Sequence, residues 1–200
     1  MNIYLKEIIL IIVCYLIGSF SFAAFFSKIY RKIDIYKSGD FTPDAGNVYR
    51  TVSKLLGILV WVMDFVRVYI IVWAIGYFLL PSYPILVLLV GFALIIGHYF
   101  PILHKFIGGH EEITYVAFLL YFAPLSTLCI IILSLLVIFI FKQLRFAKYM
   151  IVILPPILSY ILNYFFATNK FAKIDVKYLF LTSICIGIIS FLVSRKSRSV

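Results

Sequence analysis

Polar residues gather in three parts of an otherwise apolar sequence, and the first part is a loop after the first apolar segment. The loop follows a Gly18-Ser19 pair, and its glycine, hydroxyl, amide and guanidinium residues are Ser38, Gly39, Asn47 and Arg50. At a membrane surface such a loop can bind an anion through backbone N–H groups, hydroxyls and the guanidinium. The same residue types also form ordinary turns. From these residue types alone we favour a polar connector.

The second part runs from GHYFP at residues 97–101 to a glycine pair, Gly108-Gly109, followed by His110, Glu111 and Glu112. A Gly-Gly pair that opens a helix can place backbone amides and the positive helix end against a phosphate. The alternative is a helix-breaking turn in which the two glutamates favour a helix N-terminus. Both interpretations remain open at this point.

All three histidines of the chain, His98, His104 and His110, lie in this same stretch. Their spacing of six does not place them on one helical face, and the sequence has no HExxH pattern. We therefore expect no metal and no other cofactor.

The third part is a pair of opposite charges, Asp64 and Arg67, within an apolar segment. Ionisable groups at that depth are costly and pair with one another. We expect an internal ion pair that fixes helix packing. A proton- or ion-transport role would need further deep carboxylates to continue a path, and the sequence offers none.

The elements that must position these groups are transmembrane helices. The chain of 200 residues is 64% hydrophobic, with a mean hydropathy of +1.12, against about 45–50% apolar residues in a soluble domain. A soluble core could not bury that much apolar surface. We predict an all-α, polytopic integral membrane protein that forms a single domain over residues 1–200.

A helix needs about 20 apolar residues to cross the hydrocarbon core. We predict that the apolar segments lie at residues 8–29, 55–80, 85–103, 114–141, 149–166 and 178–193. The segment 114–141 is either one long helix or two pieces broken near Pro124. With the break, the chain has about seven transmembrane or partly spanning helices.

The distribution of basic residues selects the broken form. The net charge is +10, and most of the 18 Lys and Arg residues lie in short loops. If 114–141 is a hairpin, these loops share one side, as the positive-inside rule expects. We therefore predict an external N-terminus and a cytoplasmic C-terminus in the cell membrane. The basic charge then reflects topology, and we expect no nucleic-acid partner.

These stretches, in this order, resemble the bacterial acyl-phosphate:glycerol-3-phosphate acyltransferases, the PlsY family. YLIGSFSF at residues 15–22 is similar to Y-L-x-G-S-x-x-F. IDIYKSG at 33–39 with NVYR at 47–50 is similar to I-D-[IL]-R-x-x-G-S-G-N-x-G-A-T-N-V-x-R. DFVR at 64–67 corresponds to D-x-x-K, and GHYFP to G-H-x-[FY]-P. Gly108-Gly109 corresponds to the central glycines of K-G-G-K-G-V-A-T.

The resemblance implies transfer of a fatty acyl group from acyl-phosphate to the 1-hydroxyl of glycerol-3-phosphate, a step of phospholipid biosynthesis that gives lysophosphatidic acid. Both substrates are anions, so catalysis needs positive charge and amide donors more than a protein nucleophile. The implied partners are these two substrates and the lipid bilayer, from which the acyl chain would enter.

The resemblance also assigns roles to residues of this chain. Ser38, Asn47, Arg50 and His98 would be catalytic, and Gly39, Gly108, Gly109, Lys142 and Arg145 would bind the substrates or their phosphates. Gly18, Ser19, Asp64 and Arg67 would be structural.

The chain departs from the family pattern in the same loops. The loop between Gly39 and Asn47 is two residues longer and lacks the hydroxyl before the Asn. The lysines that flank the glycine pair are replaced, and carboxylates follow it, which would repel an anion. The C-terminal H-R-E-N-type motif is absent. The alternatives are therefore a catalytically silent member that binds lipid or partners, and an acyltransferase with a changed acceptor.

Overall fold

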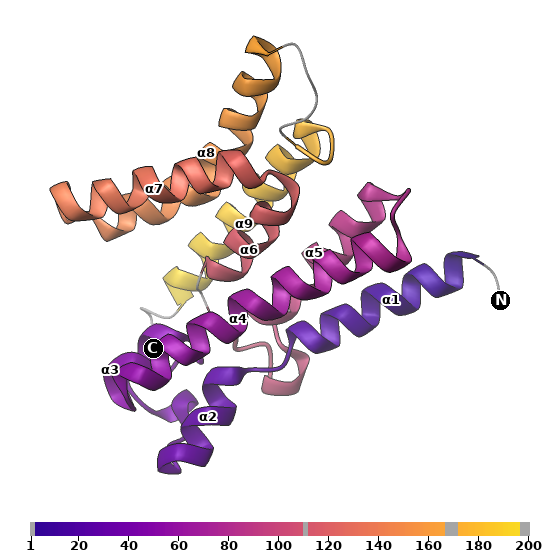
Figure 1. Ribbon diagram of the computed structural model, residues 1–200. Coiled ribbons are helices and arrows are strands. Elements are labelled where there is room, and N and C mark those ends of the chain that lie inside the picture. The colour runs from indigo at the N-terminus through magenta and orange to yellow at the C-terminus, as the bar shows by residue number, and fades with distance from the viewer. Residues whose placement is uncertain (1–2, 110–111, 167–171, 197–200) are drawn as a thin grey trace.

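The computed structural model describes residues 3–109, 112–166 and 172–196 (Figure 1). Over this part of the chain all the regular structure is helical. The α-helices are α1 (Ile3–Gly18), α2 (Phe22–Arg31), α3 (Ala45–Thr51), α4 (Lys54–Ala74), α5 (Pro84–Tyr99), α6 (Ile113–Phe122), α7 (Pro124–Phe141), α8 (Leu144–Phe165) and α9 (Val176–Lys196). Among the described residues, six helical stretches are long and apolar enough to cross a membrane, and α6 is a shorter apolar helix. The predicted all-α membrane fold with about seven spanning or partly spanning helices is confirmed.

The first apolar segment differs from the single helix predicted over residues 8–29. It is divided into α1 and α2 by a short break after Gly18. Ser21 caps α2, because its hydroxyl accepts a hydrogen bond from the backbone N–H of Ala24 at 3.1 Å. Helix α2 is amphipathic and carries Lys28 and Arg31 in its last turn, which is typical of a helix that lies in a membrane interface.

Helices α1 and α5 approach each other closely near the break between α1 and α2. A Cβ atom on Gly97 would lie 2.2 Å from the carbonyl oxygen of Tyr15, and one on Gly18 would lie 2.1 Å from that of Leu94. Small residues allow such backbone contact between membrane helices. The Tyr15 hydroxyl also donates a hydrogen bond to the carbonyl of Phe100 at 2.7 Å. The ends of α1 and α5 are therefore fixed side by side.

The break near Pro124 is present, so the hairpin form of segment 114–141 is confirmed. Helix α6 ends at Phe122, and α7 begins at Pro124, whose missing N–H is no loss at the first position of a helix. Helix α6 is buried along nearly all its length, with Tyr115 and Phe118 inaccessible. A helix too short to span is thus shielded by its neighbours, as expected.

Helices α8 and α9 complete the bundle. Helix α8 contains Pro155 and Pro156 and packs between α7 and α9. Buried hydroxyls link these helices: Ser159 donates to Ser126 at 2.8 Å, and the Tyr115 hydroxyl lies 2.7 Å from that of Ser183. Such interhelical bonds satisfy polar groups that lipid cannot.

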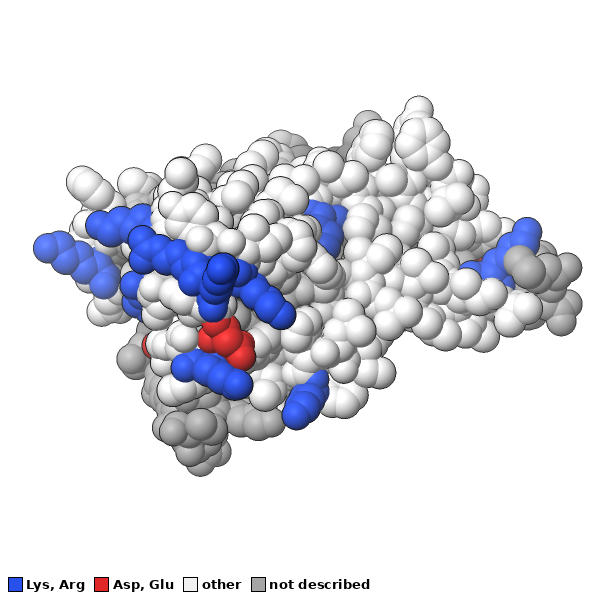
Figure 2. Space-filling model, turned by 90° about the horizontal axis from the view of Figure 1, so that it is seen from below, with Lys and Arg blue, Asp and Glu red and all other residues white. Residues whose placement is uncertain are grey.

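The two ends of the bundle differ in charge. The start of α1 and the end of α9 lie at opposite ends of the molecule (Figure 1). Figure 2 shows Lys and Arg side chains gathered at the end that holds α2 and α3, with a large surface free of charged side chains between them and the other end. The polar loops identified in the sequence lie at this basic end.

Candidate functional site

The loop between α2 and α3 is folded by one buried side chain, that of Asn47. Its amide group donates hydrogen bonds to the carbonyls of Ser38 and Thr42, each at 2.9 Å. Its Oδ1 accepts a hydrogen bond from the backbone N–H of Asp40 at 3.2 Å. Gly39 has a φ of +59°, and a Cβ there would lie 2.1 Å from that same oxygen. Asn47 and Gly39 therefore shape the loop.

Helix α3 begins inside this loop, which the sequence had suggested to be only a connector. Asp44 caps it by accepting a hydrogen bond from the backbone N–H of Asn47 at 2.7 Å and one from the Thr42 hydroxyl, also at 2.7 Å. An N-cap of this kind stabilises a helix by about 1 kcal/mol. The cap places Arg50 in the last turn of α3.

Arg50 lies at the surface and carries an ion pair. Its guanidinium contacts the carboxylate of Asp40, and the two side chains are 57% and 55% exposed. Asp40 belongs to the lengthened part of the loop, and sequence reasoning gave it no role. The guanidinium is thus accessible to an anion, but a carboxylate of the chain already contacts it.

A buried cluster of charged and polar groups lies next to this loop. Asp64, Arg67 and His98 are only 1%, 8% and 5% exposed. Arg67 donates to the Asp64 carboxylate at 2.7 Å and to the backbone carbonyl of Phe20, at the break between α1 and α2. Its Nη2 atom also lies 3.2 Å from Nδ1 of His98. The cluster joins α4, α5 and the end of α1.

The glycine pair packs against the end of α5. A Cβ on Gly108 would lie 2.2 Å from the carbonyl oxygen of His98 and 2.3 Å from that of Tyr99. A Cβ on Gly109 would lie 2.9 Å from Nε2 of His98. Only glycines allow the loop to come this close to the helix end and its imidazole.

Several of the predicted site residues meet around one small cavity, of about 10 Å³. Its walls come from the α1–α2 break, the α3 loop, the end of α5 and the glycine pair. The lining residues are Gly18, Ser19, Phe20, Ser21, Pro43, His98, Pro101, Gly108 and Gly109. Such a volume holds about one water molecule, so a phosphate fits only if the surrounding loops move apart.

Other predicted residues lie outside this cavity. Ser38, Gly39, Asn47 and Arg50 belong to the adjoining loop and α3, while Lys142 ends α7 in the left-handed region and is exposed. Arg145 falls within α8, but its side chain lies outside the described part of the structure, as do His110 and Glu111.

Glu112 is the acidic residue after the glycine pair that the structure describes, and its carboxylate has partners. Its carboxylate pairs with Nζ of Lys148 at 3.0 Å and accepts a hydrogen bond from the Ser190 hydroxyl at 3.1 Å. These contacts tie the start of α6 to α8 and α9. The ammonium group offsets the negative charge that was expected to repel an anion.

The loop beside the cavity also contains a half-buried tyrosine, Tyr36. Its ring stacks on that of His104, with the ring centroids 5.0 Å apart. Burial raises the pKa of Tyr36 to about 12, and the Asp34 carboxylate adds to the increase. The phenol therefore stays protonated at any physiological pH.

Among the described residues, no group of three or more His, Cys, Asp or Glu side chains is placed to hold a metal.

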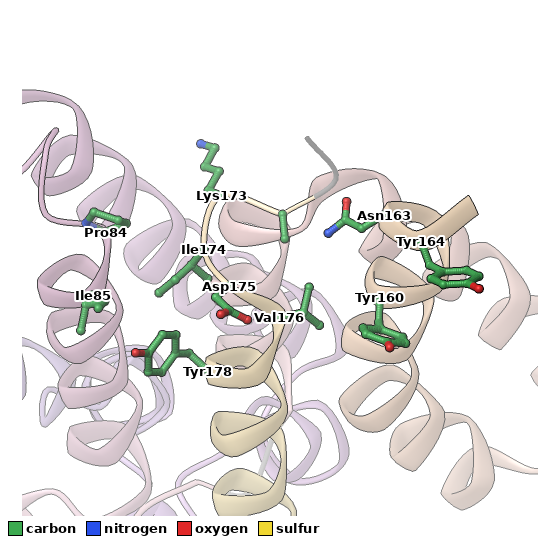
Figure 3. Close-up of a pocket in the computed structure, with 11 residues that line it drawn as sticks. Pro84, Ile85, Tyr160, Asn163, Tyr164, Lys173, Ile174, Asp175, Val176 and Tyr178 are labelled. Carbon is green, nitrogen blue, oxygen red and sulfur yellow. The ribbon is translucent and has the colours of Figure 1, made fainter. Parts of the chain in front are cut away.

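A larger cavity, of about 670 Å³, lies at the opposite end of the bundle between α5, α8 and α9 (Figure 3). It is lined mainly by tyrosines and by the segment before α9, and none of the predicted site residues lines it. Its charged groups have partners, because Lys173 lies 3.7 Å from the centroid of the Tyr121 ring and Asp175 pairs with Lys177 at 2.9 Å. Its size alone does not make it the site of the chemistry.

The fold and the loops at its basic end define a polytopic membrane protein whose candidate site gathers glycines and a buried imidazole around one cavity, beside a loop with an exposed arginine. The family model described as glycerol-3-phosphate acyltransferase matches residues 8–198 of the chain. The chain therefore belongs to the glycerol-3-phosphate acyltransferase family, and the resemblance seen in the sequence is confirmed.

Individual relatives agree with this assignment. The glycerol-3-phosphate acyltransferase of Herminiimonas arsenicoxydans is 33% identical over 159 residues, which cover 78% of this chain and 77% of the relative. That of Cupriavidus necator is 30% identical over 162 residues, 80% of each chain. Two crystal structures of PlsY, an integral membrane glycerol 3-phosphate acyltransferase, share the fold, in the glycerol 3-phosphate and lysophosphatidic acid forms. Their TM-scores are 0.77 and 0.75 and their identities 21% and 23%; each match covers 97% of this chain and 90% of the PlsY chain.

Proposed function

We propose that this chain transfers an acyl group from acyl-phosphate to the 1-hydroxyl of glycerol-3-phosphate and so makes lysophosphatidic acid. The observation that carries the proposal is the convergence of Ser19, His98 and the Gly108-Gly109 pair around one cavity. The loop of Ser38 and Arg50 adjoins this cavity through Pro43. The relatives named above carry this acceptor in their names.

The reaction needs anion binding more than a protein nucleophile. The glycerol hydroxyl attacks the acyl carbonyl carbon, a new C–O bond forms, and the bond from that carbon to the phosphate oxygen breaks. Inorganic phosphate leaves and takes up the hydroxyl proton, so that the acyl-phosphate dianion and the alcohol give an ester and hydrogen phosphate. The Arg50 guanidinium and the amides of Gly108 and Gly109 would bind the phosphates of the two substrates.

An apolar groove beside Arg50 would hold the acyl chain. The groove has a volume of about 370 Å³, lies between α3 and α4, and is lined by Ala45, Gly46, Tyr49, Gly57, Ile58 and Trp61. A Cβ on Gly46 would lie 3.5 Å from Nη1 of Arg50, so one end of the groove meets the guanidinium. If Arg50 binds the phosphate group of acyl-phosphate, the acyl chain would thus lie on an apolar, lipid-accessible surface.

The proposal is tested by transfer of labelled acyl groups from acyl-phosphate to glycerol-3-phosphate in reconstituted membranes. Loss of a charge-assisted contact of about 1.5–3 kcal/mol lowers the rate about 10- to 150-fold, which is the effect expected for Arg50→Ala. Arg31→Ala, at the exposed end of α2, is the matched control and should have little effect. Absence of transfer under conditions in which the Herminiimonas arsenicoxydans protein is active would overturn the proposal.

A second candidate, a member that binds lipid or anions without transfer, is favoured by the Asp40–Arg50 ion pair. The Asp40 carboxylate already contacts Arg50, the residue expected to bind phosphate. Binding of an anion and transfer of an acyl group are therefore separate questions for this chain. Phosphate binding by a chain that forms no product with glycerol-3-phosphate would support this candidate. Transfer to a zwitterionic acceptor instead would support a changed acceptor.

The proposed setting is a single membrane domain in the cell membrane, with the N-terminus outside and the site facing the cytoplasm. The basic residues at the α2–α3 end support this orientation. Single cysteines at Lys37 and Lys173, introduced into a chain without its three native cysteines, would report it in whole cells. An impermeant thiol reagent should label position 173 and leave position 37 unlabelled; the reverse pattern contradicts the orientation.

A further inference from the structure

The buried contact between Arg67 and His98 has a chemical consequence for the imidazole. Nη2 of Arg67 lies 3.2 Å from Nδ1 of His98, and both side chains are nearly inaccessible. A guanidinium has five N–H donors and no acceptor, and it stays charged in proteins. Nδ1 must therefore be the acceptor in this hydrogen bond. The ring hydrogen of neutral His98 then lies on Nε2.

The groups around Arg67 hold it in this orientation. Its guanidinium donates to the Asp64 carboxylate at 2.7 Å and to the carbonyl of Phe20, and it lies 5.1 Å from the centroid of the Phe22 ring. Three elements, α4, α2 and the break before α2, thus fix one planar group. The Asp64 carboxylate is 3.8 Å from Nδ1 of His98, which is too long for a hydrogen bond. Asp64 therefore acts on Arg67 and does not compete for the imidazole.

The other ring nitrogen faces the glycine pair. Nε2 of His98 lies 2.9 Å from the position of a Cβ on Gly109, and His98, Gly108 and Gly109 line the same small cavity. A hydrogen on Nε2 is consequently directed to the place where the loop amides would bind an oxyanion or phosphate. A donor that is already oriented in the folded site stabilises negative charge more than one that must reorient.

We propose that Arg67 is a positioning residue that fixes His98 as the neutral Nε2–H tautomer, and that this N–H is a hydrogen-bond donor to the oxyanion or phosphate bound at Gly108-Gly109. The inference rests on the proposed function for the identity of the bound group. The tautomer itself is a property of the folded chain, and it can be measured without turnover. Asp64 completes the arrangement by holding the guanidinium in place.

The direct test is the nitrogen NMR spectrum of the full chain labelled with [¹⁵N]histidine, with the His98 signals assigned from a His98→Gln variant. The wild type should show the pattern of a neutral ring protonated on Nε2. Arg67→Met keeps most of the volume but removes the donors, so the Nδ1–H tautomer should become populated. Arg67→Lys, whose ammonium also only donates, should restore the wild-type pattern. Asp64→Asn combined with Arg67→Met avoids an uncompensated buried carboxylate and serves if the single variant does not fold.

Kinetics distinguish positioning from mere structural support. Arg67→Met should lower kcat about 10- to 100-fold with a much smaller change in KM, and Arg67→Lys should recover most of the loss. A wild-type ring protonated on Nδ1, or an unchanged Nε2–H pattern in the Met variants, would overturn the positioning role. The expected spectra in a chain that transfers no acyl group would refute the proposed function and leave the tautomer assignment standing.

Discussion

Removal of the Asp40 carboxylate should tighten the binding of phosphate to Arg50. Asp40 contacts the guanidinium that would bind the substrate phosphate, so the anion must displace it. Asp40→Asn keeps the size of the side chain and the backbone N–H that donates to Asn47, but it removes the competing charge. The affinity for inorganic phosphate, and the apparent affinity for acyl-phosphate, should therefore rise.

The size of the effect follows from the exposure of the pair. The two side chains are 57% and 55% exposed, and exposed ion pairs contribute about 0.2–1 kcal/mol because water and salt screen them. Converted to an equilibrium constant, this gives an increase in affinity of about 1.4- to 5-fold. The increase should shrink as ionic strength rises, since the competing contact is itself screened.

The assay is calorimetric titration of phosphate into purified protein, at low and at high salt. Asp34→Asn is the matched control, because Asp34 is in the same loop, pairs with Lys37 at 3.7 Å and is similarly exposed. Unchanged or weaker phosphate binding in Asp40→Asn, with the control also unchanged, would refute the view that Asp40 competes for Arg50.

Three further changes test the site, the groove and the loop. Gly109→Ala should reduce transfer severalfold or more, because its Cβ would lie 2.9 Å from the imidazole and force it to move, whereas nothing lies within 4 Å of a Cβ in the control Gly187→Ala; equal activities would contradict this. Ile58→Trp should lower kcat/KM for long acyl chains more than for short ones by filling the groove, and Ile70→Trp on the same helix should not. Burial raises the pKa of Tyr36 from 10.0 to about 12, so its contribution to stability is complete below pH 10 and is lost as the pH rises through about 12. In Tyr36→Phe, the free energy of unfolding should therefore change less with pH over that interval than in the wild type. An unchanged slope of unfolding free energy against pH would argue against this role of Tyr36.

Hydropathy and charge predicted most of the membrane plan because both depend on local sequence. Pro124 cannot continue a hydrogen-bonded helix, so the break before α7 was visible in advance. The division of the first apolar segment was not. It depends on the Ser21 cap and on Arg67, a residue far along the chain that takes up the free carbonyl of Phe20. No local pattern reports such a contact.

The site was predictable as a set of residues and less so as an arrangement. His98 and the glycine pair were recognised from their motifs, and the structure brings them together. The backbone contacts of the Asn47 side chain depend on how the lengthened loop folds around it. Repulsion by Glu112 was expected from its position after the glycines, but its partner Lys148 comes from another helix. The Asp44 cap was readable in principle as an acidic residue three positions before Asn47, at the start of a helix.

The balance between the two products tests the central claim, acyl transfer to glycerol-3-phosphate, most directly. Reconstituted protein would be supplied with acyl-labelled acyl-phosphate, and both lysophosphatidic acid and inorganic phosphate would be quantified with and without glycerol-3-phosphate. We predict one labelled acyl group in lysophosphatidic acid for each phosphate released, and phosphate release only when the acceptor is present. Phosphate release that does not depend on glycerol-3-phosphate, or no labelled lysophosphatidic acid at all, would contradict the claim.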